Sequence, residues 1–392
     1  MNRYVIIGNG VAGDSAAVKI RELDSAGPID MFTREEHSFY YRPRLIDYLA
    51  GEVTLQRITL HRKEWYDEQH IGLHLSTEIA SVDTVKKEVA TSSGEVFPYD
   101  RLLFATGAEC FVPPISGVPE QKERVFTLKH SGDADRILEK AKASKEALLI
   151  GGGLLGLETG NSLRKLGLSV HVVEFFPRLL PRQLDVKGAG ILQSILASLG
   201  FVFYLGETSE RLDGDGARLR LHLKSGKTVE GDFVIVSAGV RPDLTLARKA
   251  GLAVGKGITA DDLMKTSVAD IFAAGDAIEH RSRLYGIWPP AREQGEVAGS
   301  VMAGHQKAYE GTLPSHKLKV VGIDLVSMGE IDAEEKHESL VLFHEGKSYK
   351  KAVVSEGTVI GAIMLGDTAG ETQVAKAIRE KAPVDSVREF FR

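Results

Sequence analysis

The chain has 392 residues, which is enough for two or three domains, and its 43% hydrophobic and 26% charged residues are typical of a globular protein. A net charge of −5 argues against a general nucleic-acid binder, which would usually be basic. No apolar run reaches the roughly 18 residues of a membrane span, and three glycines and Asp14 interrupt the apolar N-terminus, so we expect a cytoplasmic protein without a signal peptide.

The first predicted element is a strand at residues 3–7, which leads into a glycine-rich turn and then a helix-like run. The turn has the pattern G-x-G-x-x-G. Gly8 permits the tight turn, Gly10 lets the backbone approach a pyrophosphate, and Gly13 lets the helix pack close to the strand. A single turn of this kind also occurs as an ordinary strand–helix connection, so it does not establish a dinucleotide site by itself.

An acidic residue follows this turn at the distance expected for a carboxylate that binds a ribose. A second strand is predicted at about residues 29–33, and Glu35 lies 22 positions after Gly13, close to the offset of about 20. Glu35 is therefore the candidate ligand of the ribose hydroxyl, and Glu36 remains an alternative.

Residues 37–45 combine a proline with aromatic and basic side chains, which suits a bent segment that opens a helix at about 45–50. This segment is either a packed loop or lies beside the isoalloxazine ring of a flavin. In the second interpretation, Arg42 or Arg44 supplies positive charge near the reduced flavin.

A strand at residues 101–105 ends in Thr106-Gly107, which would bring the main chain close to something flat or anionic. The only cysteine, Cys110, follows. One cysteine excludes an internal disulfide, a C-x-x-C pair and a cysteine-ligated iron–sulfur cluster within one chain. The histidines show no convincing metal-ligand spacing, so we predict no metal site.

After a linker at 110–118, a second glycine turn repeats the pattern. A buried strand at 147–150 leads into Gly151, Gly153 and Gly156, and a helix is predicted at about 155–167. The positive end of the helix dipole favours an anion at this turn. Two turns of one type, each between a strand and a helix, predict two dinucleotide sites.

The next strand, at 169–173, is followed by Glu174, which lies 18 positions after Gly156. A carboxylate at this position would bind a ribose hydroxyl and repel a 2′-phosphate, so the sequence favours NADH over NADPH. Arg178 is close enough in sequence to weaken that preference.

Two further strand ends carry candidate residues. The strand at 232–237 runs into Gly239, like the earlier Ala-Thr-Gly exit, and the apolar strand that begins at residue 271 stops at Gly275-Asp276. Asp276 could bind a sugar or ribityl hydroxyl, act on a phosphate through water, or cap a helix. A helix that begins near Trp288 and its two prolines could point its N-terminus at the flavin, or it could be an ordinary capped helix.

Beyond residue 314 the pattern changes to short strands and a late helix, which predicts a separate α+β domain. The strands are expected at 318–321, 325–328, 339–344, 349–354 and 358–365, and the helix at 372–381.

These motifs together resemble the FAD-dependent pyridine nucleotide–disulfide oxidoreductase superfamily over essentially the whole chain. Tyr41 to Leu45, the run Arg178 to Asp185 and Gly286 to Pro289 look like NADH:rubredoxin oxidoreductases and the flavoprotein module of nitrite reductase large subunits. The resemblance implies an α/β fold with two Rossmann-like domains, the second inserted in the first, and a C-terminal α+β domain. The implied ranges are 1–110 and 234–312 for the FAD domain, 111–233 for the NAD domain and 313–392 for an interface-like domain.

The resemblance also implies which residues hold the cofactors FAD and NADH. For FAD they are Gly8, Gly10, Gly13, Glu35, Arg42, Pro43, Ala105, Thr106, Gly107, Asp276 and Trp288. For NADH they are Gly151, Gly153, Gly156, Glu174 and Gly239. Glu158 near the nicotinamide and Arg42 near the flavin would be the catalytic residues, in the sense that they position the reacting groups.

One departure from the superfamily decides much about function. Its disulfide reductases carry a redox cysteine pair, and its peroxidase and coenzyme A-disulfide branches carry a single cysteine near the flavin, but residues 39–45 contain none. Cys110 lies where the family does not place its redox cysteine, which favours a structural role. A second departure is Asp47, where ferredoxin reductases often have a lysine.

We therefore predict an enzyme that takes hydride from NADH and passes electrons to an external acceptor, with rubredoxin or another small iron protein as the first candidate. Docking of an acidic partner could use Arg42, Arg44, Arg281 and Arg283. The alternatives are an NADH oxidase, a nitrite-reductase-associated flavoprotein subunit, or an NADH-sensing flavoprotein without fast turnover. The sequence predicts no nucleic-acid or membrane partner and leaves a homodimer open.

Overall fold

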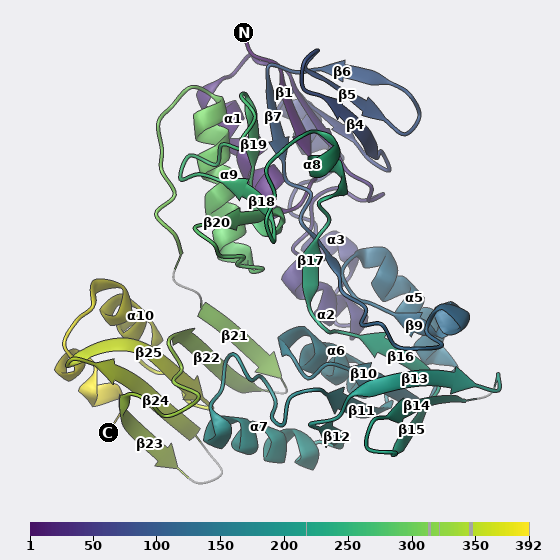
Figure 1. Ribbon diagram of the computed structural model, residues 1–392, viewed down its shortest axis with the longest axis vertical. Coiled ribbons are helices and arrows are strands. Elements are labelled where there is room, and N and C mark those ends of the chain that lie inside the picture. Colours follow the sequence, from purple (N-terminus) through teal and green to yellow (C-terminus); the bar gives the residue numbers. More distant parts are fainter. Residues whose placement is uncertain (217, 313–314, 321, 345–347, 392) are drawn as a thin grey trace. The chain divides into compact units, whose positions relative to one another are not determined.

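The computed structural model describes residues 1–392 except 217, 313–314, 321, 345–347 and 392 (Figure 1). The chain divides into two compact units, which are described separately. The four predicted domain ranges do not coincide with these units, because range 1–110 includes residues 45–52 of unit 2 and range 234–312 includes residues 234–239 of unit 2; the ranges stay predictions. Unit 1 consists of Met1–Arg44, Val53–Glu109 and Val240–Thr312, and unit 2 of Leu45–Glu52, Cys110–Gly239 and Leu313–Arg392.

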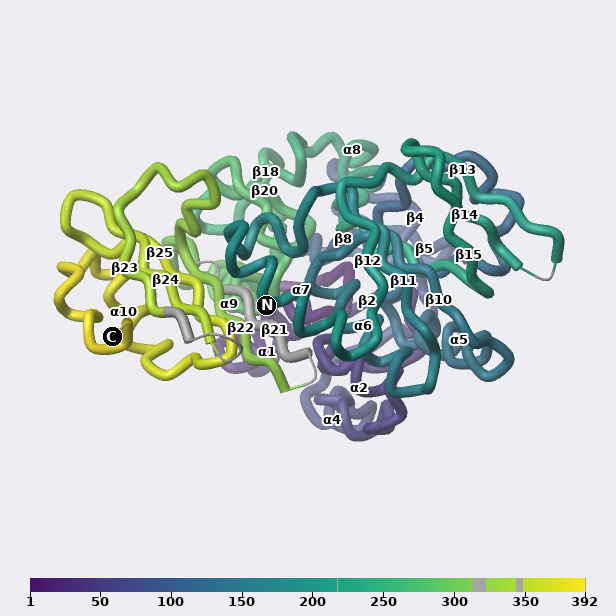
Figure 2. The backbone as a smooth tube through the Cα atoms, turned by 90° about the horizontal axis from the view of Figure 1, so that it is seen from below, coloured from purple at the N-terminus to yellow at the C-terminus, as the bar shows by residue number. Residues whose placement is uncertain are grey.

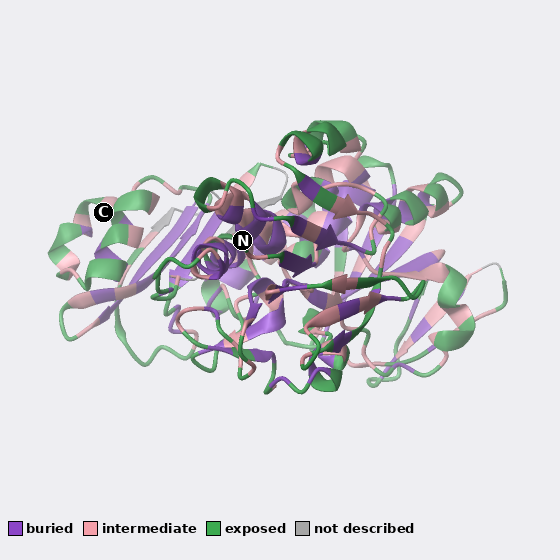
Figure 3. Cartoon of the chain, turned by 90° about the horizontal axis from the view of Figure 1, so that it is seen from above, coloured by how far each residue is buried: buried purple, intermediate pink, exposed green. Residues whose placement is uncertain are grey.

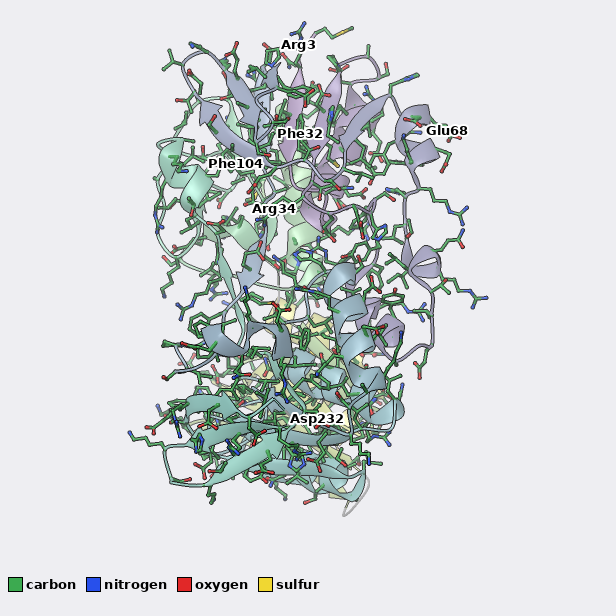
Figure 4. All side chains as sticks on the ribbon, turned by 90° about the vertical axis from the view of Figure 1, so that its right-hand side faces the viewer. Arg3, Phe32, Arg34, Glu68, Phe104 and Asp232 are labelled. Atoms are coloured by element: carbon green, nitrogen blue, oxygen red, sulfur yellow. The ribbon has the colours of Figure 1, made fainter. Side chains whose placement is uncertain are left out.

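Unit 1 is built on a parallel sheet of five strands in the order β19-β7-β1-β2-β3. β1 lies between β2 and β7, and Ile7 pairs with Phe32 on one side and with Phe104 on the other. Both phenylalanines are buried, and Figure 4 shows them inside the unit. Continuous apolar strands fit a parallel sheet that is covered on both faces. The bounds are β1 (Tyr4–Ile7), β2 (Ile29–Phe32), β3 (Ile71–His74), β7 (Arg101–Phe104) and β19 (Ile271–Ala273).

Two helices that are far apart in sequence pack closely in unit 1. α1 (Val11–Leu23) and α9 (Trp288–Met302) lie side by side (Figure 1). A Cβ on Gly295 would lie 2.3 Å from the carbonyl oxygen of Ala12, and one on Gly299 would lie 2.5 Å from that of Ala16. Glycine at these two positions is therefore what allows the close approach of the helices.

Shorter elements complete unit 1. β4, β5 and β6 form an antiparallel sheet, and β18 pairs with β20 in parallel. The bounds are β4 (Ile79–Asp83), β5 (Glu88–Thr91), β6 (Val96–Pro98), β17 (Val240–Pro242), β18 (Ile258–Ala260), β20 (Ile278–His280), α3 (Leu55–Ile58), α4 (Lys63–Glu68), α8 (Thr245–Lys249), and the 3-10 turns η1 (Arg42–Arg44) and η3 (Gly275–Ala277). β8 (Ala108–Cys110) ends at the first residue of unit 2.

Unit 2 contains a second parallel sheet, in the order β12-β11-β10-β16-β9. Ile150 pairs with Val173 and with Val236, which repeats the arrangement around Ile7 in unit 1. The helix predicted at 155–167 is observed as α6 (Leu154–Lys165). The other bounds are β9 (Val125–Phe126), β10 (Glu146–Ile150), β11 (Ser169–Glu174), β12 (Phe201–Leu205), β16 (Phe233–Val236), η2 (Pro119–Arg124), α5 (Ser131–Lys142) and α7 (Val186–Ser198).

Two smaller elements belong to the same unit. An antiparallel sheet consists of β13 (Ser209–Gly214), β14 (Leu219–Leu223) and β15 (Thr228–Gly231). The short helix α2 (Leu45–Leu49) packs against α5 and α6, where the Tyr48 hydroxyl donates to Asp135 Oδ1 at 2.5 Å. The predicted helix after the proline-containing segment therefore belongs to unit 2.

The C-terminal part of unit 2 is an antiparallel sheet in the order β21-β22-β25-β24-β23, with α10 packed on it (Figure 2). Figure 3 shows the central strands of this sheet as buried. All five predicted strands and the helix are present, although Val321, the end of the first predicted strand, lies outside the described residues. The bounds are β21 (Ser315–Val320), β22 (Ile323–Gly329), β23 (Glu338–His344), β24 (Ser348–Ser355), β25 (Thr358–Leu365), α10 (Glu371–Glu380), η4 (Val384–Ser386) and η5 (Arg388–Phe391).

A buried polar network joins this sheet to the N-terminus of α7. Asp185 caps α7 by accepting from the Gly188 N–H at 2.8 Å, and its other oxygen accepts from the Tyr349 hydroxyl at 2.5 Å. Lys351 Nζ lies 3.4 Å from the same Asp185 oxygen and 3.7 Å from Asp332 Oδ2. Buried charges of this kind are stable only when they are paired, so the network holds the two parts of unit 2 in one arrangement.

Among the helices of the described residues, none is long and apolar enough to cross a membrane.

Candidate functional sites

The first glycine turn has the geometry that its sequence predicts. Gly8 has φ +115°, and a Cβ there would lie 2.1 Å from the carbonyl oxygen of Ala105. A Cβ on Gly13 would lie 1.9 Å from the carbonyl oxygen of Gly8. Gly10 differs, because a Cβ there would meet no protein atom within 4 Å. Gly8 and Gly13 thus serve packing, whereas Gly10 faces open space at the N-terminus of α1, where an anion would bind.

Three strand exits meet at this edge of the sheet. The turn follows β1, Thr106 follows β7 and Gly275 follows β19, and these strands are neighbours. A Cβ on Gly275 would lie 2.9 Å from the Ala12 side chain of the glycine turn. The carboxyl edge of a parallel sheet is where such folds bind nucleotides. The structure therefore brings together segments that the sequence places about 100 and 270 residues apart.

The Ala-Thr-Gly exit presents polar and open positions. The Thr106 hydroxyl is buried and has no hydrogen-bond partner among the described residues. Gly107 has φ +70°, and a Cβ there would meet no atom within 4 Å. A buried hydroxyl without a partner is uncommon in native proteins, and it fits a site that a ligand completes.

Gln294 of α9 fixes the turn that carries Asp276. Its side-chain oxygen accepts from the Gly275 N–H at 2.9 Å, and Gln294 is 1% exposed. Asp276 lies in the middle of η3 and is half-buried. The sequence drew attention to Asp276 but not to Gln294, which is 18 positions further along the chain.

An aromatic cluster surrounds the start of α9. The Trp288 ring stacks on Phe39, with centroids 5.7 Å apart and planes at 15°, and it meets Tyr41 edge-on at 4.7 Å. Arg42 and Pro43 follow in η1. The structure therefore places the segment at residues 39–43 directly against Trp288, and the flavin-binding roles of Arg42, Pro43 and Trp288 stay predictions.

The surroundings of Glu35 differ from those of Glu174. Val173, which pairs with Ile150, is followed by Glu174, whereas Phe32, which pairs with Ile7, is followed by Thr33. Glu35 lies two residues beyond the equivalent position. Its carboxylate accepts from the Tyr40 hydroxyl at 2.5 Å and forms an ion pair with Arg42. The ribose-binding role of Glu35 stays a prediction, and its carboxylate here orients the segment that carries Arg42.

A buried pair beside the first turn was missed by sequence reasoning. Asp14, in the first turn of α1, is 5% exposed, and its Oδ1 lies 2.7 Å from His61 Nδ1. Burial raises the pKa of the Asp14 carboxyl, and the hydrogen bond with His61 acts in the opposite direction. The Trp65 ring stacks on His61 with centroids 3.7 Å apart. No spacing rule connects residues 14 and 61, so only the fold reveals the pair.

The second glycine turn repeats the geometry of the first. A Cβ on Gly151, which has φ +113°, would lie 2.3 Å from the carbonyl oxygen of Ser237, and one on Gly156 would lie 2.3 Å from that of Gly151. Gly153 faces open space within 4 Å, as Gly10 does. Gly239, after the neighbouring strand β16, has φ +98° and is likewise open. These positions fit a nucleotide that passes close to the main chain.

Glu174 is held by two main-chain donors. Oε2 accepts from the Gly152 N–H at 2.6 Å, and Oε1 accepts from the Phe176 N–H at 2.8 Å. The residue is 7% exposed. Arg178 does not approach this carboxylate by hydrogen bonding, since its guanidinium donates to the main-chain oxygens of Pro181 and Leu184 at 3.2 and 3.4 Å. The carboxylate is therefore fixed in position with lone pairs left for a ribose.

The other predicted residues are also placed. Glu158 is half-buried in the second turn of α6, after Gly156. The thiol of Cys110 lies 4.0 Å from the Leu128 carbonyl oxygen. Within the described ranges, no group of three or more His, Cys, Asp or Glu side chains could hold a metal ion.

The fold and the sites define a protein with two dinucleotide-binding domains, each with its glycine turn at the carboxyl edge of a parallel sheet, and a C-terminal α+β domain. Residues 2–295 match the model of the pyridine nucleotide-disulphide oxidoreductase family, and residues 314–382 match that of the rubredoxin NAD+ reductase C-terminal domain. The chain belongs to the pyridine nucleotide-disulphide oxidoreductase family and is an oxidoreductase.

Individual relatives agree with this assignment. The chain is 35% identical to a nitrite reductase [NAD(P)H] of Bacillus subtilis (strain 168), over 97% of this chain and 48% of that protein. It is 31% identical to the NADH-rubredoxin oxidoreductase of Clostridium acetobutylicum, over 98% of this chain and 96% of that protein. The crystal structure of NADH:rubredoxin oxidoreductase from Clostridium acetobutylicum is similar with a TM-score of 0.85, at 29% identity and 99% coverage of both chains. The chain spans about half the length of the nitrite reductase from Bacillus subtilis.

Proposed function

We propose that this protein is an FAD-dependent reductase that takes hydride from NADH and passes electrons to an external acceptor, with rubredoxin or another small iron protein as the first candidate. The observation that carries the proposal is the pair of open glycine turns combined with the lack of a cysteine in residues 39–45. Electrons that enter such a protein have no thiol beside the aromatic segment to receive them, so the acceptor must be another molecule.

The residues of unit 1 fit FAD. Gly10 and Gly107 leave room for a ligand at the main chain, and the unpartnered Thr106 hydroxyl can donate to it or accept from it. Trp288 and Tyr41 give an aromatic border of the kind that contacts a planar ring. A bound flavin accepts two electrons together and releases them one at a time, which suits a one-electron iron acceptor.

The chain itself contributes position and charge. α9 extends over 15 residues, and the positive end of its dipole at Trp288 would stabilise negative charge at a neighbouring ring edge. Arg42, held by Glu35, adds a cation to the same segment. Asp276, on the turn that Gln294 fixes, is a candidate acceptor for a ribityl hydroxyl.

The residues of unit 2 fit NADH better than NADPH. The Glu174 carboxylate is fixed by two main-chain N–H groups and can accept from a ribose 2′-hydroxyl, whereas it would repel a 2′-phosphate. Arg178 donates to main-chain carbonyls of Pro181 and Leu184 and not to this carboxylate, which leaves both carboxylate oxygens to the two N–H groups and a ribose. We further propose that Glu158, in the helix after the turn, positions the nicotinamide.

Three relatives bear on the choice of acceptor. One relative, matched over 98% of this chain and 96% of its own length, is named as an NADH-rubredoxin oxidoreductase. A role as an electron-input module for nitrite reduction is the second candidate, because the nitrite reductase relative has more than twice the matched length. The chain is also 33% identical, over 83% of its length, to an NADH oxidase of Methanocaldococcus jannaschii, so oxygen is included among the acceptors to be tested.

Anaerobic stopped-flow absorbance of the FAD-loaded protein tests the proposal. NADH and NADPH are mixed with it separately while the flavin band is followed, and the reduced protein then meets rubredoxin, nitrite or oxygen. Fast bleaching by NADH and fast reoxidation by rubredoxin are expected. Reoxidation by oxygen alone would favour an oxidase, and lack of bleaching by either nucleotide would favour an NADH sensor.

A further inference from the structure

An exposed leucine among cationic side chains lies next to the aromatic residues of unit 1. Leu60 is 50% exposed, and Arg57, Arg62 and Lys63 are exposed around it in sequence. We call these four residues the Leu60 surface. A single exposed leucine is ordinary on a protein, so its position relative to the candidate flavin site decides whether it matters.

Main-chain hydrogen bonds tie this surface to the predicted flavin segment. The Tyr41 N–H donates to the Ile58 carbonyl at 2.8 Å, and the Leu60 N–H donates to the Phe39 carbonyl at 2.9 Å. Tyr40 and Thr59 form an antiparallel bridge between these bonds. The segment that carries Leu60 is therefore paired directly with residues 39–41, and Phe39 and Tyr41 of that segment contact Trp288.

Ring contacts support the surface from behind. Phe39 stacks on Trp288 at 5.7 Å between centroids, and it lies 6.2 Å from His61, whose ring in turn stacks on Trp65 at 3.7 Å. Asp14 holds the His61 ring at 2.7 Å. These packed rings connect the segment that carries Leu60 with Trp288, so a partner bound there would lie beside the predicted flavin segment.

The cations of this surface are available to a partner. Within the described part of the chain, Arg57, Arg62 and Lys63 form no ion pair with a carboxylate. In contrast, Arg42 pairs with Glu35 and Arg281 pairs with Asp262 at 2.7 Å.

Acidic residues do follow this surface, on α4. Glu64, Asp67 and Glu68 belong to that helix, and Figure 4 shows Glu68 on its outer side. The charge of residues 57–68 is thus divided between a basic part at 57–63 and an acidic part at 64–68. A partner that docks on the basic part would need a negative patch of limited width.

We propose that the Leu60 surface is the docking site for a small acidic iron protein that receives electrons from this reductase. The proposal rests on the proposed function and adds the place of docking. Complementary charge would steer the partner, and Leu60 would form the apolar centre of a small interface with a charged rim. Electron transfer falls steeply with distance, which favours docking beside the flavin segment.

Binding is measured without turnover, by calorimetric titration of the oxidised FAD-loaded protein with an oxidised rubredoxin of net negative charge. The double variant Arg57→Glu/Arg62→Glu should raise Kd about tenfold or more at about 50 mM salt and flatten its salt dependence. Leu60→Ser should raise Kd several-fold and leave the salt dependence unchanged. The neutral variant Arg57→Gln/Arg62→Gln gives an intermediate Kd and reports binding even if charge reversal disturbs folding.

A matched control separates docking from net charge. Lys249→Glu/Lys256→Glu changes the same total charge at exposed positions outside the 57–63 segment, and it should leave Kd within about twofold. Reduction of the flavin by NADH should be unchanged in every variant. Equal weakening by the control pair, or an unchanged Kd in both Arg57/Arg62 variants, would overturn the docking site.

The docking site and the proposed function fail in different ways. If the wild-type protein reduces rubredoxin and the Arg57/Arg62 variants do so with the same apparent affinity, only the docking site is wrong. A [2Fe–2S] ferredoxin of net negative charge, titrated in parallel, tests the wider class of small iron proteins. If the wild-type protein neither binds nor reduces rubredoxin or this ferredoxin, the proposed class of acceptor is wrong and the docking site is overturned with it.

Discussion

Replacement of Glu174 by glutamine removes one negative charge from the second nucleotide site and preserves the size of the side chain. In the wild-type chain, each carboxylate oxygen accepts one main-chain N–H, at 2.6 and 2.8 Å. Glutamine has one carbonyl oxygen and an NH2 group, so one of the two N–H groups would face a donor. An unpaired buried donor costs roughly 1–3 kcal/mol, which loosens the turn that carries Gly152.

The expected effect on the nucleotides follows from these contacts. A hydrogen bond to a charged acceptor contributes roughly 1.5–3 kcal/mol, so Kd for NADH should rise about 10- to 100-fold. A carboxylate and a phosphate about 4 Å apart repel each other by roughly 4 kcal/mol at an effective dielectric constant of about 20. Loss of that repulsion should help NADPH, and the preference for NADH should fall by about 100-fold or more.

Flavin reduction in an anaerobic stopped-flow instrument measures both quantities. The observed rate, as a function of NADH or NADPH concentration, gives an apparent Kd and a limiting rate for each nucleotide. Glu174→Asp, which keeps the charge on a shorter side chain, is the matched control and should retain rejection of NADPH. An NADH Kd within about twofold of wild type, together with unchanged rejection of NADPH, would refute the assignment of Glu174.

Three further predictions concern folding and cofactor retention. Gly13→Ala should lower soluble yield and thermal stability, because its Cβ would lie 1.9 Å from a main-chain oxygen. Gly10→Ala, whose Cβ meets no protein atom, should melt like wild type and lose FAD absorbance. Equal FAD retention in both variants would contradict this. Asp185→Ala, which leaves Lys351 with only part of its buried pairing, should cost about 3–5 kcal/mol in urea unfolding, and a cost below about 1 kcal/mol would contradict the network. Folding raises the pKa of Asp14 above its ordinary value of 3.8, so the folded state binds the proton more tightly. The stability of the wild type relative to Asp14→Asn should therefore decline as pH rises from about 4 towards the raised pKa and then level off. Urea unfolding midpoints of both proteins across that pH range test this. A stability advantage of the wild type that grows with pH would contradict it.

The sequence by itself determined the two nucleotide-binding turns and their surroundings. Each turn is a contiguous strand, glycine pattern and helix, so local steric rules are sufficient to predict it. The second helix, predicted at 155–167, is observed at Leu154–Lys165, and the C-terminal strands lie where short apolar runs predicted them. Family resemblance added the expected cofactors but no geometry.

Only the tertiary structure decided which distant side chains meet. Asp14 contacts His61 across 47 positions, and Asp185 contacts Tyr349 across 164, and neither pair has a spacing that a helix or strand period could reveal. The same holds for Glu35. Strand register shows that Thr33 is the residue equivalent to Glu174 and that Glu35 lies two residues further along, which its offset to Gly13 does not reveal. Local patterns encode the backbone of a turn, whereas burial and pairing of polar groups depend on how separate elements pack, which one sequence does not display.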